Sequence, residues 1–196
     1  MWQRVIITAI EAFAGAIIYL PILLLLNRPL FRSKKTTAYS VFAFYVASLY
    51  AITGIPTIYN CSFDGFVYLV PFVGMAYDVL NSFLNVILFV PLGFFLPFLC
   101  YRLGKLKNTL LFGFLTSFSV ELLQLFTYRK TDINDIITNT VGTLVGFLAF
   151  RLITRKQPKA KVHGSIKELF VVLVAVFATM FFIQPVIVSF AKEIIW

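Results

Sequence analysis

The sequence predicts an all-α integral membrane protein, a helical bundle of about six transmembrane helices with an extracytoplasmic interfacial or re-entrant segment after the second. Hydrophobic residues make up 60% of the 196 positions, against roughly 45–50% in soluble domains. Long apolar runs alternate with short basic loops, and helices satisfy their own backbone hydrogen bonds in lipid. The runs lack the two-residue alternation of transmembrane β-strands. We expect a single transmembrane domain over residues 1–196.

Two peripheral spans are predicted before the polar region, at 5–26 and 38–55. The first is long enough to cross a hydrocarbon core of about 30 Å and too long for a signal peptide. It contains Glu11, an acidic side chain that is costly in lipid. Two interpretations of Glu11 stay open: contact with headgroups near the outer end of the span, or a role facing the bundle.

The stretch 57–81 contains no lysine or arginine. Its apolar part, 66–76, is interrupted by Pro71 and Gly74 and is too short to cross the bilayer. We therefore expect this part to lie at the membrane interface or to fold back into the bundle.

Four further spans are predicted, at 80–100, 109–128, 133–153 and 169–190. The first of these contains Pro91 and Pro97, each of which removes a backbone donor. We therefore expect that span to be kinked, and we expect the last one to be peripheral to the polar region.

The net charge of +9 indicates membrane topology rather than nucleic-acid binding, because most of the 17 lysines and arginines lie in short loops between apolar runs. Three such loops alternate along the chain, at 27–35, 102–107 and 151–167. The positive-inside rule places them in the cytoplasm. We therefore expect a multi-pass plasma-membrane protein with both termini, the stretch 57–81 and the turn 129–135 on the extracytoplasmic side.

Polar side chains follow one face of each of two neighbouring spans, because residues three, four or seven apart share a helix face. These residues are Ser117, Glu121, Gln124 and Tyr128 on the fourth span and Asp132, Asp135, Asn139, Gly142 and Gly146 on the fifth. The short turn makes the spans antiparallel neighbours, so the two faces meet about 10 Å below the outer end. Asn85 of the third span falls in the same layer. Ionisable side chains inside a membrane indicate a functional site, so we predict one here.

Structural roles compete with this interpretation. Asp132 is placed to cap the fifth helix, and Asp135 to stabilise its first turn. Gly142 and Gly146 are more typical of a close helix contact than of a ligand site. Arg129 would serve equally well as a headgroup anchor.

Glu121 and Gln124 are harder to explain in this way, because only polar contact between helices would account for them structurally. The expected partner of Glu121 is Arg129, or alternatively the amides of Asn85 and Asn139.

The polar positions form the ordered combination Asn, Pro-x-Gly, Glu-x-x-Gln, Arg, Asp-x-x-Asp and Asn-x-x-Gly in two segments, NVILFVPLGFFLP and SVELLQLFTYRKTDINDIITNTVGTLVG. This combination resembles the VanZ-like family of bacterial membrane proteins, which is named for a teicoplanin resistance protein. The resemblance covers about 81–146, within a family core of about 81–153. By the family pattern, the characteristic positions are Asn85, Glu121, Gln124, Arg129, Asp132, Asp135 and Asn139.

The resemblance implies resistance to teicoplanin and related lipoglycopeptides at the cell envelope of a bacterium. These antibiotics act on lipid-linked wall precursors of the outer leaflet, and teicoplanin itself carries an acyl tail. The resemblance implies no particular mechanism.

The first functional hypothesis is a non-enzymatic binding protein with an outward-facing polar pocket. The pocket would hold a lipid, a headgroup or an antibiotic moiety, with Arg129 pairing a phosphate or carboxylate. Its ligand-binding residues would be Asn85, Gln124, Tyr128, Arg129 and Asn139. The expected partners are membrane lipids, a lipid-linked cell-wall precursor or an acylated glycopeptide, whereas the oligomeric state is not predicted.

The alternative is an intramembrane enzyme acting on a lipid-linked cell-envelope precursor. Glu121 would be its catalytic acid or base. Asp132 and Asp135 would complete the catalytic site and bind Mg²⁺ or Ca²⁺, hard cations that prefer oxygen ligands. A transporter is less favoured, because the polar layer does not continue through the inner half of the membrane.

Overall fold

The structure, a computed structural model, describes residues 33–63, 66–73, 78–127, 129–154 and 164–195. The predicted first span, 5–26, with Glu11, lies outside these residues, and so does Tyr128. The chain divides into two compact units, one within 1–62 and 167–196 and the other formed by Phe63–Ile166. Each unit is helical, as predicted.

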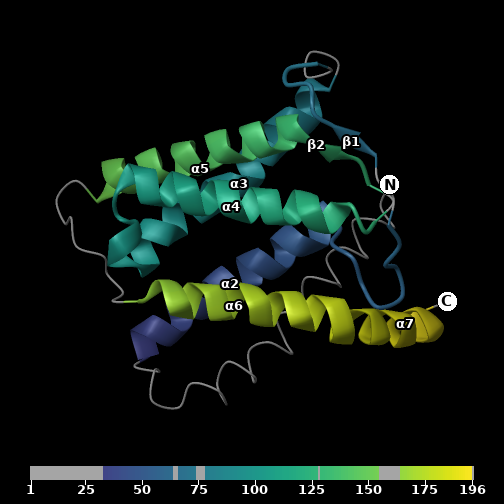
Figure 1. Cartoon of the computed structure of the whole chain (residues 1–196). Helices are drawn as coiled ribbons and strands as arrows, with labels where there is room; N and C mark the ends of the chain where they lie inside the picture. Colours follow the sequence, from purple (N-terminus) through teal and green to yellow (C-terminus); the bar gives the residue numbers. More distant parts are fainter. Residues whose placement is uncertain (1–32, 64–65, 74–77, 128, 155–163, 196) are drawn as a thin grey trace. The chain divides into compact units, whose positions relative to one another are not determined.

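The first unit consists of α2 (Ser33–Thr53), most of α6 (Ile166–Ala178), the π-helical turn η2 (Thr179–Ile183) and α7 (Gln184–Ile195). Figure 1 shows α6 running through η2 into α7. Apolar side chains such as Phe42, Val46 and Leu169 are fully buried. The Tyr39 hydroxyl donates to Glu168 Oε2 at 2.8 Å, so a polar contact joins α2 to the start of α6.

The π-helical turn in this unit has a local cause. Pro185 has no N–H to close a helical hydrogen bond onto the carbonyl of Phe181, four residues earlier. The backbone N–H of Ile58 donates to that carbonyl instead, at 3.1 Å. The chain after α2 therefore satisfies an acceptor that proline leaves open in the helix.

The second unit contains three long helices and two short strands. They are β1 (Val67–Tyr68), α3 (Val79–Leu99), the 3₁₀ turn η1 (Tyr101–Leu103), α4 (Leu106–Gln124), β2 (Thr131–Asp132) and α5 (Ile133–Ile153). Helices α3, α4 and α5 pack side by side, and β1 pairs with β2 at the end where α4 stops and α5 begins (Figure 1). Asp78 caps α3 by accepting a hydrogen bond from the Asn81 backbone N–H at 3.2 Å.

Glycines allow α3 and α5 to approach until backbone meets backbone. A Cβ at Gly142 would collide with the Val86 carbonyl, and one at Gly146 with the Val90 carbonyl. In the reverse direction, a Cβ at Gly93 would collide with the carbonyl of α5 residue Thr143. The prediction that the Gly142 and Gly146 pair makes a close helix contact is confirmed.

The number of spans differs from the prediction. The described chain has three helices long and apolar enough to cross a membrane, Val79–Leu99, Ile133–Ile153 and Ile166–Phe190, and a shorter apolar helix, Thr37–Thr53. Helix α4 is a fifth candidate span, but its polar face makes it less apolar than the three long helices just named. The bundle described therefore has about four to five spans rather than six.

The stretch after the second predicted span forms a short strand and turns where the structure describes it before α3. Residues 66–73 form no helix, contain β1 and lie at the end of the second unit beside β2. Their place at a membrane interface stays a prediction. Pro91 and Pro97 both lie within α3.

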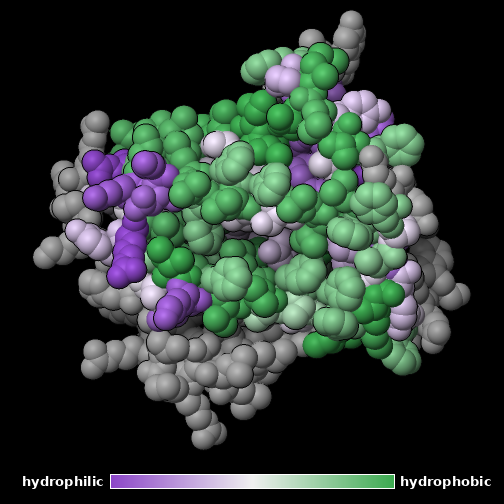
Figure 2. Space-filling view, viewed as in Figure 1, coloured by the Kyte–Doolittle hydropathy of each residue, from purple (hydrophilic) through white to green (hydrophobic). Residues whose placement is uncertain are grey.

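In the second unit, strongly hydrophilic side chains gather at one end of the helices. Apolar side chains cover much of the visible face, and strongly hydrophilic ones gather where α4 begins and α5 ends (Figure 2). The exposed basic residues at that end are Arg102, Lys105, Lys107 and Arg151. The described basic residues of the predicted loops 102–107 and 151–167 named here therefore mark the end of the second unit opposite β1 and β2.

A substitution tests the α3–α5 contact. We expect Gly146→Ala to lower the midpoint of thermal unfolding in detergent, because the added methyl group has no space beside Val90. Overpacking of this kind costs about 1–3 kcal/mol. Val145→Ala changes the neighbouring exposed position of α5 and should stay close to wild type. Equal midpoints for the two variants would show that the contact is looser than described.

Candidate functional site

Glu121 is the most deeply buried carboxyl group in the described chain, with 2% of its surface exposed. It lies one turn before the end of α4. Its Oε2 accepts a hydrogen bond from the Asp132 backbone N–H at 3.0 Å, and its own carbonyl accepts one from Thr131 Oγ1 at 3.1 Å. Glu121 thereby fixes the last residues before α5, where amide protons have no partner inside the helix.

The partner of Glu121 is thus different from the amide partners that were predicted. The Asn85 amide donates to Asp135 Oδ1 at 2.7 Å, and the Asn139 amide donates to Ser117 Oγ at 2.9 Å. Helix spacing predicts which residues share a layer, but it does not say which of them pair across helices. Arg129, the other predicted partner, lies exposed on the turn, where its positive charge acts on both Glu121 and Asp135.

These two amide bonds do bring together the three helices that the polar layer was predicted to join. Asn85 connects α3 to α5, and Asn139 connects α5 to α4. Asn139 is 3% exposed, and its Oδ1 is buried without a hydrogen-bond partner among the described residues. A donor from a ligand would satisfy this oxygen.

Asp132 acts as the N-cap of α5. Its side chain accepts from the Asn134 backbone N–H at 2.8 Å, which confirms the capping interpretation. Asp135 lies in the first turn of α5, where a negative charge is favourable. The described residues contain no group of three or more histidine, cysteine, aspartate or glutamate side chains placed to hold a metal ion. Binding of Mg²⁺ or Ca²⁺ by Asp132 and Asp135 stays a prediction.

Gln124 is buried at the end of α4, and its backbone carbonyl accepts hydrogen bonds from the N–H and the hydroxyl of Thr127. These bonds close the helix before the turn. Arg129 and Lys130 follow on the exposed surface, and the Lys130 ammonium lies 5.3 Å from the centre of the Tyr68 ring in β1. The turn therefore presents two cations beside the segment 66–73.

Asn134 is a structural residue that the sequence analysis missed. It is 4% exposed, and its Oδ1 accepts from the Phe72 backbone N–H at 2.7 Å, while its Nδ2 donates to the Val73 carbonyl at 3.1 Å. One side chain thus bonds a backbone N–H and a backbone carbonyl at the end of the segment 66–73. The sequence signal for it was an asparagine in the first turn of a helix whose N-cap was already supplied by Asp132, so its amide was left for another role.

Strand pairing holds the other half of the same segment. Val67 pairs in parallel with Thr131, and Tyr68 with Asp132. The Thr131 N–H also donates to the carbonyl of Phe66 at 3.1 Å. The segment 66–73 is therefore attached to the junction of α4 and α5 along most of its length.

We expect Asn134→Ala to release residues 66–73, because it removes both side-chain hydrogen bonds to them. At about 1 kcal/mol each, their loss should speed backbone hydrogen exchange in this segment by roughly tenfold or more. Asn108→Ala is the matched control, since it removes one side-chain bond at the other end of α4. Equal exchange of 66–73 in wild type and Asn134→Ala would contradict the assignment.

Comparison with known proteins places this arrangement in a family. The VanZ/LLP1 family matches residues 42–154, which is more than half of the chain and includes the whole polar layer. "Protein VanZ" of Enterococcus faecium is 34% identical over 83 residues, which cover 42% of this chain and 51% of that protein. The chain thus spans about half the length of this relative. No solved structure matches. The chain is a multi-pass membrane protein that belongs to the VanZ/LLP1 family.

Proposed function

We propose that this protein contributes to resistance to teicoplanin and related lipoglycopeptides by binding an acylated ligand at the extracytoplasmic end of α4 and α5. The ligand would be the antibiotic itself or an outer-leaflet lipid, such as a lipid-linked cell-wall precursor. The observation that carries the proposal is the apolar segment 66–73, which is held rigidly beside two cations.

The apolar character of this segment supports contact with an acyl chain. Phe66, Leu69, Val70 and Phe72 each expose between 63% and 70% of their surface. Such a surface is costly in water and favourable against hydrocarbon. Because Asn134 and β2 fix the backbone, little further ordering is needed when a ligand binds.

The adjacent cations support recognition of an anionic group on the same ligand. Arg129 and Lys130 are both exposed on the turn that carries β2. Arginine pairs carboxylates and phosphates through two parallel hydrogen bonds, and lysine adds a point charge. An apolar surface next to cations suits an amphiphile with an acyl tail and a negative charge.

The sidedness rests on the basic residues at the other end of the second unit. Lysines and arginines exposed where α4 begins favour the cytoplasm, so the segment 66–73 would face outward. We also propose that both termini are extracytoplasmic, which requires the predicted span 5–26, outside the described residues, to cross the membrane before α2.

An intramembrane enzyme is the second candidate, with Glu121 as acid or base and Asp132 and Asp135 as cation ligands. The buried, unpartnered Oδ1 of Asn139 favours a ligand within this layer. However, the hydrogen bonds of Glu121 and Asp132 to backbone amides at the start of α5 already give both carboxylates a structural role. We therefore place binding before catalysis.

Antibiotic susceptibility in cells tests the binding proposal. We expect expression of the chain to raise the minimal inhibitory concentration of teicoplanin more than that of its deacylated form. The double variant Arg129→Gln, Lys130→Gln should lose most of this protection, because the charge on the ligand loses its partners. Lys107→Gln, at the opposite end of α4, and the charge-keeping pair Arg129→Lys, Lys130→Arg should retain it. Full protection by the neutralised double variant would refute the proposal.

Two substitutions at Glu121 separate binding from catalysis. Glu121→Gln keeps an oxygen that accepts from the Asp132 N–H, but it removes the ionisable carboxyl group that an acid or base needs. We expect this variant to keep both its thermal stability and its protection against teicoplanin. Glu121→Ala should unfold more easily by about 1–3 kcal/mol, since it leaves a buried donor without a partner. A stable Glu121→Gln protein that gives no protection would favour the enzyme instead.

A further inference from the structure

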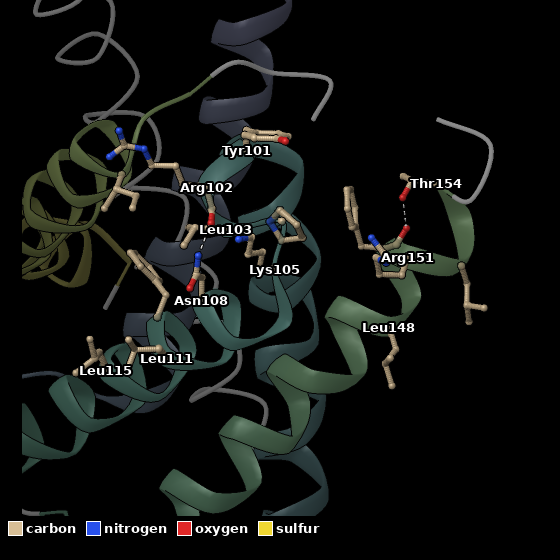
Figure 3. Close-up of a pocket in the computed structure, with 16 residues that line it drawn as sticks. Tyr101, Arg102, Leu103, Lys105, Asn108, Leu111, Leu115, Leu148, Arg151 and Thr154 are labelled. Atoms are coloured by element: carbon tan, nitrogen blue, oxygen red, sulfur yellow. Dashed lines mark hydrogen bonds between the residues drawn. The ribbon is translucent and has the colours of Figure 1, made fainter. Parts of the chain in front are cut away.

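The second unit has a groove of about 1100 Å³ at the end opposite the segment 66–73. It opens between the start of α4 and the end of α5, and residues of α3 and η1 line its remaining side. Figure 3 shows the labelled side chains of α4 and α5 on its two sides. The polar layer around Glu121 and Asn139 contributes no residue to it.

The mouth of the groove is positively charged. Arg102 and Lys105 come from the connection between α3 and α4, and Arg151 from the last turn of α5 (Figure 3). Among the described residues that line the groove, none is acidic. The start of α4 adds partial positive charge, because the first amides of a helix point outward without partners inside it. The site is therefore complementary to a negatively charged group.

The connection that carries these cations is held in one conformation. The Asn108 amide donates to the Arg102 carbonyl at 2.7 Å, and the hydroxyl of the fully buried Thr109 donates to the Leu103 carbonyl. Lys105 is the N-cap residue, but its ammonium has no acceptor for the first amides of α4, so its side chain leaves them unpaired.

Below the mouth the walls are apolar. Leu111 and Leu115 of α4 and Leu148 of α5 line the groove, and each exposes about half of its surface, 54%, 50% and 48%. Lys105 and Leu115 are ten residues apart on α4, or about 15 Å along its axis. This is about half the thickness of a bilayer core, so the wall matches the depth that one acyl chain occupies.

We infer that this groove binds an anionic phospholipid of the leaflet that the basic loops face. Its phosphate would lie between Lys105 and Arg151, while Arg102, which points away from Arg151 in Figure 3, adds positive charge at the edge of the mouth. One acyl chain would lie along the leucines of α4 and α5. Charge complementarity and the apolar wall continuous with the mouth favour a lipid over a free anion, which would leave the wall unused.

The test uses the full chain purified in detergent, with retained lipid quantified by native mass spectrometry. Phosphatidylglycerol and phosphatidylcholine with identical acyl chains are the probes. We expect phosphatidylglycerol to bind at least fivefold more tightly. Neutralising Arg102, Lys105 or Arg151 to glutamine should weaken it about fivefold for each charge. Equal binding of the two lipids would overturn the inference.

Matched variants exclude a general charge effect and a folding defect. Lys107→Gln removes a nearby exposed charge that does not line the groove, so it should change binding less than twofold. Arg102→Lys with Arg151→Lys keeps the charge and should retain the preference for phosphatidylglycerol. If Lys107→Gln weakened binding as much as the groove variants, or the lysine pair abolished it, the groove would not be the site.

Filling the apolar wall distinguishes a lipid from a free anion. Leu148→Trp should reduce phosphatidylglycerol binding at least fivefold and leave thermal stability unchanged, since Leu148 is half exposed. Inorganic phosphate at 10 mM, a concentration chosen as roughly ten-thousandfold above a lipid Kd of about 1 μM, should displace little lipid. Full displacement by phosphate, with no effect of Leu148→Trp, would show a simple anion site and refute the lipid. None of these measurements involves an antibiotic, so their outcome is independent of whether the proposed function is correct.

Discussion

The junction of α4 and α5 depends on satisfying the backbone groups that a helix end and a turn leave without partners. The Glu121 side chain accepts from the Asp132 backbone N–H, and the Asp132 side chain accepts from the Asn134 backbone N–H. The Asn134 side chain in turn bonds the Phe72 N–H and the Val73 carbonyl. Each polar side chain in this series therefore forms a hydrogen bond with a backbone amide or carbonyl that has no partner within a helix. The same constraint acts in the first unit, where Ile58 donates to the carbonyl that Pro185 leaves open.

This junction in turn requires close helices. Because Gly142 and Gly146 bring α5 against the backbone of α3, the short side chain of Asn85 reaches Asp135. Larger residues at the glycine positions would separate the helices by more than an asparagine can span. The small residues and the polar layer are thus two parts of one arrangement, although in the sequence they suggest different roles.

The sequence predicts well whatever repeats along a single helix. Apolar length predicts α2, α3, α5 and α6, and helical spacing predicts that Ser117, Asn139 and Asn85 share a layer. It does not predict partners across helices, so the amides of Asn85 and Asn139 were wrongly offered to Glu121 and instead bond Asp135 and Ser117. Asn134 was missed because its hydrogen-bond partners lie about sixty residues away in the sequence. They belong to a segment whose parallel strand pairing leaves no periodic signal. The described residues contain fewer spans than predicted, since span 5–26 lies outside them and the polar face of α4 lowers its hydropathy.

The π-helical turn η2 also changes the phase of the helix that contains it. Buried residues recur at every fourth position, from Val176 through Met180 and Gln184 to Val188. In a regular α-helix each four-residue step advances the face by about 40°, so such a row would wind away from its neighbour. A wider turn at Thr179–Ile183 takes up part of that rotation. The π-helical turn thereby lessens the rotation of this row, and Gln184 stays on the buried side of the helix.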